Sequence, residues 1–546
     1  MTEGVSEKPT RAMWLTLAAM TTSASMILVD QTAVPLATPH AIDDLGAGLA
    51  DSPWILTANV LPLAAFMVLG GRLGDIHGLR KVFLIGAVIF AVATAFAGFA
   101  QDMAWMIAAR AAQGTGAALM MPTGVAIVSS VFAGPRRGTA LGILAGGSAF
   151  FAALGPVLGG LLTDLDWRLV FLINVPLAVV AIALTLASTP PLGPGAGPRP
   201  RLDYPGVVSF GLGIAAIVFG LTESQSAGWG AAATVVPLAG GVAALIAFVV
   251  IELRVDEPMI EFRLFRRLNF LAANISQMLA GMVELGIGFL LPFYLLLVVG
   301  IDPSAAGLAL LPGTIPIILA GPLAGRAFDR WGGRIPLTLG YLVLAGSGVA
   351  LAMLASEETA TSLIPGLFLQ GVGLGIILTV NDPTGLSAVP PDKQGEAAGI
   401  INTSEQFGGA IGIAALGAIE LTYYFDQLYA RFSEQGIQPT DAQVDRVTRF
   451  FQEAEQVGLR NAVTEAGGGS VIQDVASFSI AAHVEAFQLV FFVSAGISLV
   501  AAAAMFALVR KRDRIAEGPI FSRRSRWVYT TAGATPAMTK RPGEDG

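Results

Sequence analysis

The chain has 546 residues, of which 54% are hydrophobic and 13% are charged, and its formal net charge at pH 7 is -7. A soluble domain carries roughly 25% charged residues, so most of this chain is expected to face lipid or other helices. The sequence has no cysteine, which excludes disulfides and thiolate metal sites, and its three histidines, His40, His77 and His483, are all expected near loops. This composition favours neither a metal site nor an enzyme, and the negative net charge gives no indication of nucleic acid binding.

Apolar runs long enough to cross a bilayer, about 20 residues each, recur along the whole chain. They fall near residues 13–36, 52–71, 82–100, 104–132, 139–163, 169–188, 205–222, 232–252, 269–299, 305–325, 335–355, 362–388, 396–420 and 485–509. These runs predict fourteen membrane helices and an all-α membrane protein.

Basic residues fix the expected orientation, because cytoplasmic loops are enriched in lysine and arginine. With the N-terminus inside, the inner loops hold Arg72, Arg80, Lys81, Arg136, Arg137, Arg199, Arg201, Arg254, Arg263, Arg266, Arg267, Arg326, Arg330, Arg334 and Lys393. The short outer loops hold Arg168. We therefore expect a protein of the cell membrane with both termini in the cytoplasm.

A glycine-rich, charged stretch occurs twice. Its copies pair Gly71, Asp75, Gly78 and Arg80 with Gly325, Asp329, Gly332 and Arg334 at one constant offset. The first copy is expected to be a short loop, in which Gly71 and Gly78 allow close backbone approach and positive φ. Asp75 would cap a helix or face its N-terminal end.

Further matches follow downstream at a second constant offset. They pair Gln113, Gly114, Gly116, Gly138, Gly142 and Gly155 with Gln370, Gly371, Gly373, Gly395, Gly399 and Gly412. The repeats predict an N-terminal six-helix bundle at 1–189, a linker with two extra membrane helices at 190–264, and a C-terminal six-helix bundle at 265–512. Residues 513–546 are expected to form a disordered cytoplasmic tail.

One outer loop, at residues 421–483, is long and polar. Thr440 or Asp441 suits the start of a helix there, and Val444, Val447, Phe451 and Ala454 would share one face. We expect an extracytoplasmic helical hairpin, with an extension of the last two spans as one arrangement. It is either a solvated cap or a vestibule for substrate or a partner.

Together these stretches resemble the major facilitator superfamily, and the fourteen-span plan resembles its drug:proton antiporter branch of quaternary-ammonium and multidrug exporters. The resemblance rests on the stretch 71–81, on residues 110–116 (RAAQGTG), on residues 155–160 (GPVLGG), on residues 30–32 (DQT), and on Trp167, Arg168, Asn174 and Pro176. It implies two six-helix bundles and proton-coupled transport. Two positions depart from it, because Ile76 stands at a usually basic position and Glu405 where this branch often carries arginine.

Charged residues inside the predicted spans are costly, at about 2.5–3.5 kcal/mol each on insertion scales. Those at issue are Asp30, Arg110, Glu284, Asp382 and Glu405. Arg110 is expected to pair with Asp30, and the resemblance assigns the arginine a role in proton coupling. Glu284, Asp382 and Glu405 are candidate proton sites or partners of a cationic drug. For each of them the alternative is a purely structural role.

Substrate-binding candidates are Asp30, Glu284 and Glu405 together with the aromatic residues Phe289, Phe293, Tyr294 and Phe407, which could line an adaptable apolar cavity. Gly155 and Pro156 would bend or loosen the fifth span, and the resemblance makes this stretch a seal against leak. The repeated glycine-rich stretches are candidate gating motifs.

The resemblance and the buried charges together indicate a proton-coupled exporter of lipophilic, often cationic drugs that works by alternating access. Its partners would be a small substrate, protons and membrane lipids, and it would act as a monomer without a cofactor; the need for an accessory surface protein stays open. One alternative is an exporter of lipids or lipid-like metabolites that uses the outer hairpin. A membrane enzyme and a non-transporting sensor or scaffold are the other classes considered.

Overall fold

The computed structural model describes residues 10–48, 51–132, 137–192, 203–255, 258, 260–355, 359–390, 394–434 and 470–510. Within these ranges the regular structure is helical, and fourteen helical segments are long and apolar enough to cross a membrane. The predicted all-α class and the fourteen spans are therefore confirmed.

The first six spans run in chain order. They are α1 (Arg11–Asp44), α2 (Ser52–His77), α3 (Leu79–Gly98), α4 (Met103–Val131), α5 (Arg137–Leu165), and a sixth span made of α6 (Arg168–Leu172) and α7 (Asn174–Ser188). Side-chain caps set two of the starts, because Thr10 accepts a hydrogen bond from the Met13 amide and Asp102 from the Trp105 amide.

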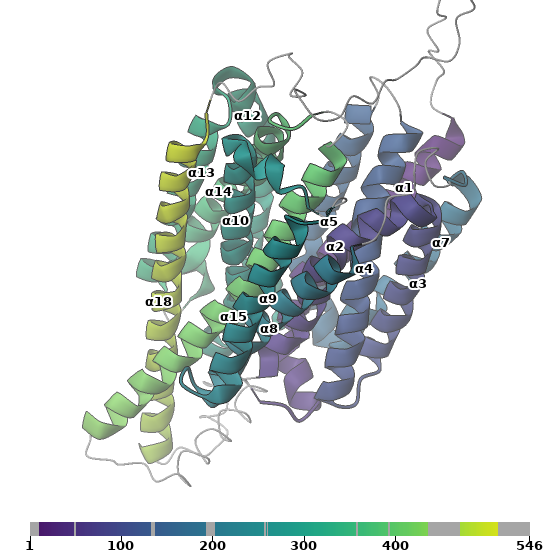
Figure 1. Ribbon diagram of the computed structural model, residues 1–546. Coiled ribbons are helices and arrows are strands. Elements are labelled where there is room, and N and C mark those ends of the chain that lie inside the picture. Colours follow the sequence, from purple (N-terminus) through teal and green to yellow (C-terminus); the bar gives the residue numbers. More distant parts are fainter. Residues whose placement is uncertain are drawn as a thin grey trace, which may run out of the picture.

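Two inserted helices, α8 (Tyr204–Ala227) and α9 (Ala232–Glu252), precede the second set of six spans. The short η3 (Phe262–Arg266) leads into that set. Three of its spans are made of two pieces each, namely α10 (Leu268–Phe293) with the π-helix η4 (Tyr294–Val299), α11 (Pro303–Ala309) with α12 (Leu311–Trp331), and η5 (Ala360–Leu363) with α14 (Ile364–Leu386). The other three are α13 (Arg334–Leu354), α15 (Gln394–Glu434) and α18 (Ser470–Leu508). The start of α1 and the end of α18 lie at one end of the molecule (Figure 1), here called the terminal end, and the other is the distal end.

Helix packing repeats between the two sets of six. In the first set, α4 packs on α2 and α3, α1 packs on α5, and α3 packs on α7. In the second set, α14 packs on α12 and α13, α10 packs on α15, and α13 packs on α18. Each pair in one set has its counterpart in the other at the same place in the order of spans, so the chain is built from two related halves.

The repeated glycines make the same close contacts in both halves. A Cβ on Gly114 would collide with the carbonyl oxygen of Asn59, and a Cβ on Gly371 would collide with the carbonyl oxygen of Gly313. Asn59 and Gly313 differ in number by the offset of the repeated charged stretch. The glycines are therefore needed for close helix approach, which is how small residues act in membrane helix packing.

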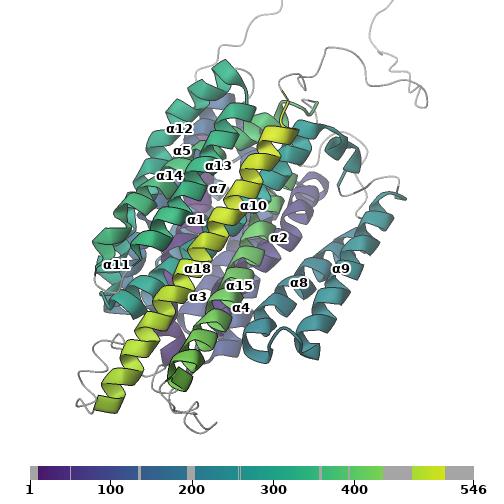
Figure 2. The same cartoon turned by 90° about the vertical axis from the view of Figure 1, so that its left-hand side faces the viewer.

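The inserted pair lies against one flank of the molecule. α8 and α9 pack on each other, and α8 also packs on α2 of the first half and on α15 of the second. Both views place α8 and α9 together on this flank, and Figure 2 shows α11 and α12 on the opposite flank. The insertion thus covers the line along which α2 and α15 meet.

The halves share an apolar core in their distal parts. The largest cluster of buried residues joins the distal part of α1, from Val29 to Leu45, to the distal part of α10. At the terminal end the first half has a buried cluster of its own, and the second half with α9 forms another, against which Val68 of α2 packs. Backbone contact is tight distally, because a Cβ on Gly160 would collide with the carbonyl oxygen of Pro303 and one on Gly307 with that of Pro156.

Two sequence-based expectations are wrong in detail. The predicted loop at 71–81 is instead the last turns of α2 and the first of α3, separated by Gly78 alone. Gly78 has φ +97° and its counterpart Gly332 has φ +74°, whereas Gly71 lies inside the helix. His483 is not near a loop but 4% exposed within α18, because that helix starts well before the apolar run.

The predicted outer hairpin is described in part. α15 has 41 residues and α18 has 39, which is about 60 Å of helix each at 1.5 Å per residue and roughly twice a bilayer's apolar thickness. Both helices thus extend past the spans expected from the sequence. The expected helix start at Thr440 or Asp441 and the expected tail at 513–546 lie outside the described residues.

We expect Gly114→Ala and Gly371→Ala each to destabilise the protein by about 1–3 kcal/mol, because the added methyl group meets backbone and not a movable side chain. Thermal unfolding of the purified protein in detergent, followed by tryptophan fluorescence, measures this. Gly142→Ala is the control, because a Cβ at that helical position meets nothing within 4 Å. Equal melting temperatures for the three variants would contradict the packing argument.

Candidate functional site

A buried ion pair lies in the middle of the first half. Arg110 on α4 and Asp30 on α1 are 0% and 1% exposed, and Nη1 of the arginine lies 2.6 Å from Oδ2 of the aspartate. The pairing expected from the sequence is therefore present. The guanidinium also lies 5.6 Å from the centre of the Phe171 ring, within the range of a cation–π contact.

The remaining polar atoms around this pair are used as well. Arg110 Nε donates to the carbonyl oxygen of Ile55 at 2.7 Å, and Nη1 donates to Gln113 Oε1 at 2.6 Å. Gln113 Nε2 in turn donates to Asp30 Oδ1 at 3.0 Å and to Thr94 Oγ1 at 2.7 Å. The network joins α1 through α4 and satisfies both charges, which is the condition for burying an ion pair at tolerable cost.

The second half gathers acids. Glu284 on α10 and Glu405 on α15 are close enough for their negative charges to act on each other, and Asp382 on α14 acts on Glu405 in the same way. Gln277 donates to Glu405 Oε2 at 2.5 Å. Oε2 of Glu284 is buried and has no hydrogen-bond partner among the described residues. The structure thus brings together the three second-half acids that the sequence singled out.

A hydrogen bond between side-chain amides links the two regions. Gln31 Nε2 on α1 donates to Gln406 Oε1 on α15 at 3.1 Å, and both residues are buried, at 7% and 4% exposure. Gln31 follows Asp30 in the chain and Gln406 follows Glu405. The ion pair of the first half and the acids of the second are therefore each one residue from a contact that crosses between the halves.

The candidate aromatic residues do not form one cluster. Phe289 and Phe293 pack together, with ring centres 5.0 Å apart, and both line a small distal cavity. Tyr294 is 0% exposed and packs on Phe487 at 5.2 Å. Phe407 packs on a cluster from α2, α8 and α15. Three of these four side chains thus lie in or near the distal part of α10, whereas Phe407 faces the inserted helix.

The repeated charged stretch joins corresponding helices in the two halves. Arg80, at the start of α3, donates to the carbonyl oxygen of Leu186 near the end of α7 at 2.8 Å. Its counterpart Arg334, at the start of α13, lies 4.2 Å from the ring centre of Phe506 near the end of α18. Asp75 and Asp329 are exposed, and Gly325 lies inside α12 with open space at its Cβ position.

Gly155 and Pro156 lie where α5 meets its neighbours. A Cβ on Gly155 would collide with Thr32 of α1, and the backbone at Pro156 contacts Gly307 of α11 in the other half. Gly412, the counterpart of Gly155, makes a matching close approach to Met282 of α10. This stretch therefore packs both within its half and across the distal contact between halves.

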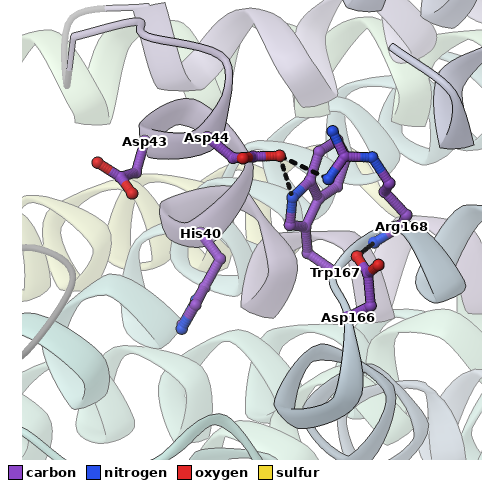
Figure 3. Close-up of a pocket in the computed structure, with 6 residues that line it drawn as sticks. All are labelled: His40, Asp43, Asp44, Asp166, Trp167 and Arg168. Carbon is purple, nitrogen blue, oxygen red and sulfur yellow. Dashed lines mark hydrogen bonds and ion pairs between the residues drawn. The ribbon is translucent and has the colours of Figure 1, made fainter. Parts of the chain in front are cut away.

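A separate pocket of about 340 Å³ opens at the distal end of the first half, and Figure 3 shows its side chains. Arg168 lies 2.5 Å from Asp44 Oδ2 and 4.4 Å from the ring centre of Trp167, whose Nε1 donates to the same carboxylate at 3.2 Å. The pair is partly solvent-exposed, at 31% and 47%, so it adds little stability by itself. It ties the end of α1 to the start of the sixth span.

Several polar residues at these positions were not singled out from the sequence as site residues, although Gln31 lies within the motif at 30–32. Gln31, Gln277 and Gln406 are uncharged, so neither hydropathy nor the cost of burying charge picks them out. Glu420 and His483 form a buried contact at 3.2 Å between α15 and α18, which the sequence placed at a span end and in a polar loop. The length of the two helices explains the difference.

The fourteen spans and the repeated bundles define a multi-pass membrane protein, and the family match and the relatives below make it a transporter and not an enzyme. The profile described as Major Facilitator Superfamily matches residues 15–413, and the chain belongs to that superfamily. A cephamycin export protein of Amycolatopsis lactamdurans is 36% identical over 401 residues, covering 72% of this chain and 82% of its own length.

Two further comparisons span nearly the whole chain. A tetracenomycin C resistance and export protein of Streptomyces glaucescens is 30% identical over 511 residues, covering 92% of this chain and 93% of its own length. Among solved structures, a bacterial homolog of the human lysosomal transporter Spinster, in an inward-facing and unoccupied conformation, matches with a TM-score of 0.64 and 15% identity, covering 94% of this chain and 100% of its own. This second likeness shows the fold alone.

We expect Arg110→Gln to destabilise the protein by about 3–5 kcal/mol, because it leaves the Asp30 carboxylate buried without its partner. Adding Asp30→Asn should restore much of that loss, since the double variant buries no net charge. Thermal unfolding of the two single variants and the double variant forms a double-mutant cycle. Additive losses in the cycle would show that the two side chains do not stabilise each other.

Proposed function

We propose that the protein is a proton-coupled exporter that moves lipophilic, often cationic drugs across the cell membrane by alternating access. The observation that carries the proposal is the Gln31–Gln406 hydrogen bond, which joins the halves beside Asp30 on one side and Glu405 on the other. A change in protonation at either acid would then act directly on the contact between the halves.

The acids of the two halves suit different parts of such a cycle. Asp30 is held by Arg110 and Gln113 with no spare polar atom, so a proton arriving there would have to break an existing contact. Glu284 and Glu405 repel each other when both are ionised, and Glu284 has an unused oxygen. A proton or a cationic substrate would relieve that repulsion, and competition between the two is what exchange requires.

The packing of the halves supports alternating access. Their distal parts share one buried core, whereas their terminal parts have two buried clusters, with Val68 of α2 packed on the cluster of the second half. The positive-inside rule assigns the terminal end to the cytoplasm, so this arrangement corresponds to access from the cytoplasm. Rocking of one half against the other would open the distal contact and release cargo outside. The antibiotic-export names of the two relatives above support a drug-like cargo.

Transport by purified protein in liposomes tests the coupling, with ethidium as the cationic probe. The wild type should move protons in the direction opposite to ethidium, and Glu405→Gln should reduce ethidium-driven proton flux by about tenfold or more, because the variant has no carboxylate to protonate at that position. A pH-sensitive dye enclosed in the liposomes measures the proton flux.

The control is Asp426→Asn, which removes an exposed acid from the same helix, beyond the predicted span. Its proton flux should equal that of the wild type. Ethidium transport that continues unchanged when the pH gradient is collapsed, or a Glu405→Gln variant that couples normally, would overturn the proposal.

A second cargo is favoured by one observation. α15 and α18 contact each other where they leave the predicted spans: Arg431 pairs with Glu485 at 2.6 Å, and the rings of Tyr424 and His483 stack with their centres 3.8 Å apart. A paired helical extension at the outer membrane surface would suit the handling of lipids or lipid-like metabolites as they leave the transporter.

Replacing residues 432–469 by a short glycine-serine linker separates the two cargoes. If lipids are the cargo, the variant should lose movement of a fluorescent phospholipid between liposome leaflets while keeping ethidium transport, because the bundle and its acids are unchanged. Undiminished lipid movement would count against the second cargo.

A further inference from the structure

A buried acid and a buried imidazole form a pair that the proposed coupling site does not use. Glu420 on α15 and His483 on α18 are 5% and 4% exposed, and Oε1 of the glutamate lies 3.2 Å from Nδ1 of the histidine. The imidazole stacks flat on the ring of Tyr424, whose hydroxyl lies 2.9 Å from Ser479 Oγ. Both ring position and ring orientation are therefore fixed.

The pair borders a cavity where the two halves meet. The cavity has a volume of about 30 Å³, enough for about one water molecule. Its walls include Ser52 and Pro53 at the start of α2 in the first half, and Phe289 and Phe293 of α10 in the second. The pair is thus enclosed by the distal contact between the halves, and parting of that contact would expose it to water.

One wall of the cavity is irregular. Leu297, which lines it, belongs to the π-helix η4, and η4 ends at Gly300 with φ +72°. A π-helical turn is a local widening of a helix that is frequent at functional sites. Tyr294 of η4 packs on Phe487, which also lines the cavity and lies one turn from His483. Movement of η4 would therefore reach the pair through a direct packing contact.

Other charged residues lie outside the lining of the cavity that the pair borders. Among the described residues that line the cavity, Glu420 and His483 are the titratable ones, and the walls from α2 and α10 contribute Ser52 and apolar groups. Near the pair on the same two helices, Glu485 pairs with Arg431, and Asp426 is exposed. Glu405 lies 15 residues before Glu420 on α15, which is about 22 Å along the helix and too far for direct proton exchange.

We propose that Glu420 and His483 form a second proton-binding site, which takes up a proton from the outer medium when the distal ends part and holds it when they close. A net charge is costly in a dry site, so the closed pair keeps one proton between a carboxylate and an imidazole. Water entering the open site lowers that cost, and the proton exchanges with the medium. The sidedness of this site rests on the orientation given under the proposed function.

The first test measures ethidium transport by the protein in liposomes, with the distal side facing a medium varied from about pH 5.5 to about pH 8.5 at fixed inner pH, the range in which imidazole titrates. Glu420→Gln keeps the acceptor oxygen, and His483→Asn keeps a donor at the Nδ1 position, but neither variant can hold a proton between a carboxylate and an imidazole. Each should shrink a roughly tenfold pH response of the wild type to less than about twofold.

The matched control for this experiment is Glu485→Gln, which removes the partly exposed acid two residues from His483. Its pH response should follow that of the wild type. If Glu420→Gln and His483→Asn melt near the wild-type temperature and yet respond to outer pH as the wild type does, the inference is overturned.

The second test does not depend on transport. The sequence has three histidines, so the His40→Gln/His77→Gln protein, purified without a histidine tag, shows His483 alone in nitrogen-15 NMR of labelled imidazole. Its signal should respond to pH, and Glu420→Gln should change that response. If the His483 signal responds to pH in a way that depends on Glu420, but the protein shows no proton-coupled transport, this site stands and the proposed function is refuted. A pH response of the His483 signal that is the same with and without Glu420→Gln would refute the site.

Discussion

The cost of placing charge in a membrane interior governs this structure. Arg110 is fully enclosed, and a guanidinium does not lose its proton in proteins, so the fold has to supply a counter-charge and acceptors around it. Asp30, the Ile55 carbonyl and Gln113 do so from three other positions on α1, α2 and α4. With the Gln113–Thr94 hydrogen bond to α3, four of the six spans of the first half are held together. The second half, which lacks such a basic partner among its central described residues, keeps its acids in a less satisfied state.

Much of the fold follows from the sequence, because two strong signals are local. Runs of apolar residues mark the spans, and the offset repeats mark the halves. Gly114 and Gly371 show why the repeat can be detected in the sequence: each lies where a neighbouring backbone leaves no room for a side chain, so both halves carry glycine at that position. The extra length of α15 and α18 is not readable in this way, because amphipathic ends of a long helix have the composition of a polar loop.

The candidate site was predictable in part. The cost of a buried charge identified Asp30, Arg110, Glu284, Asp382 and Glu405, and the structure assembles them as one ion pair and one group of acids. The contact between the two groups depends on Gln31 and Gln406, whose meeting is a consequence of tertiary packing between residues 375 positions apart. The stretch expected to be a short loop at 71–81 is almost wholly helical, because one glycine with positive φ is enough to turn the chain.

The flank covered by α8 and α9 has a bearing on how the contact between the halves faces the surrounding lipid. Two lines of contact join the halves, one between α2 and α15 and one between α5 and the α11–α12 segment. α8 packs over the first of them, whereas among the described helices no inserted element packs over the second. The two lines of contact therefore differ towards the surrounding lipid, since the α2–α15 line is covered by an inserted helix and the α5–α12 line is not.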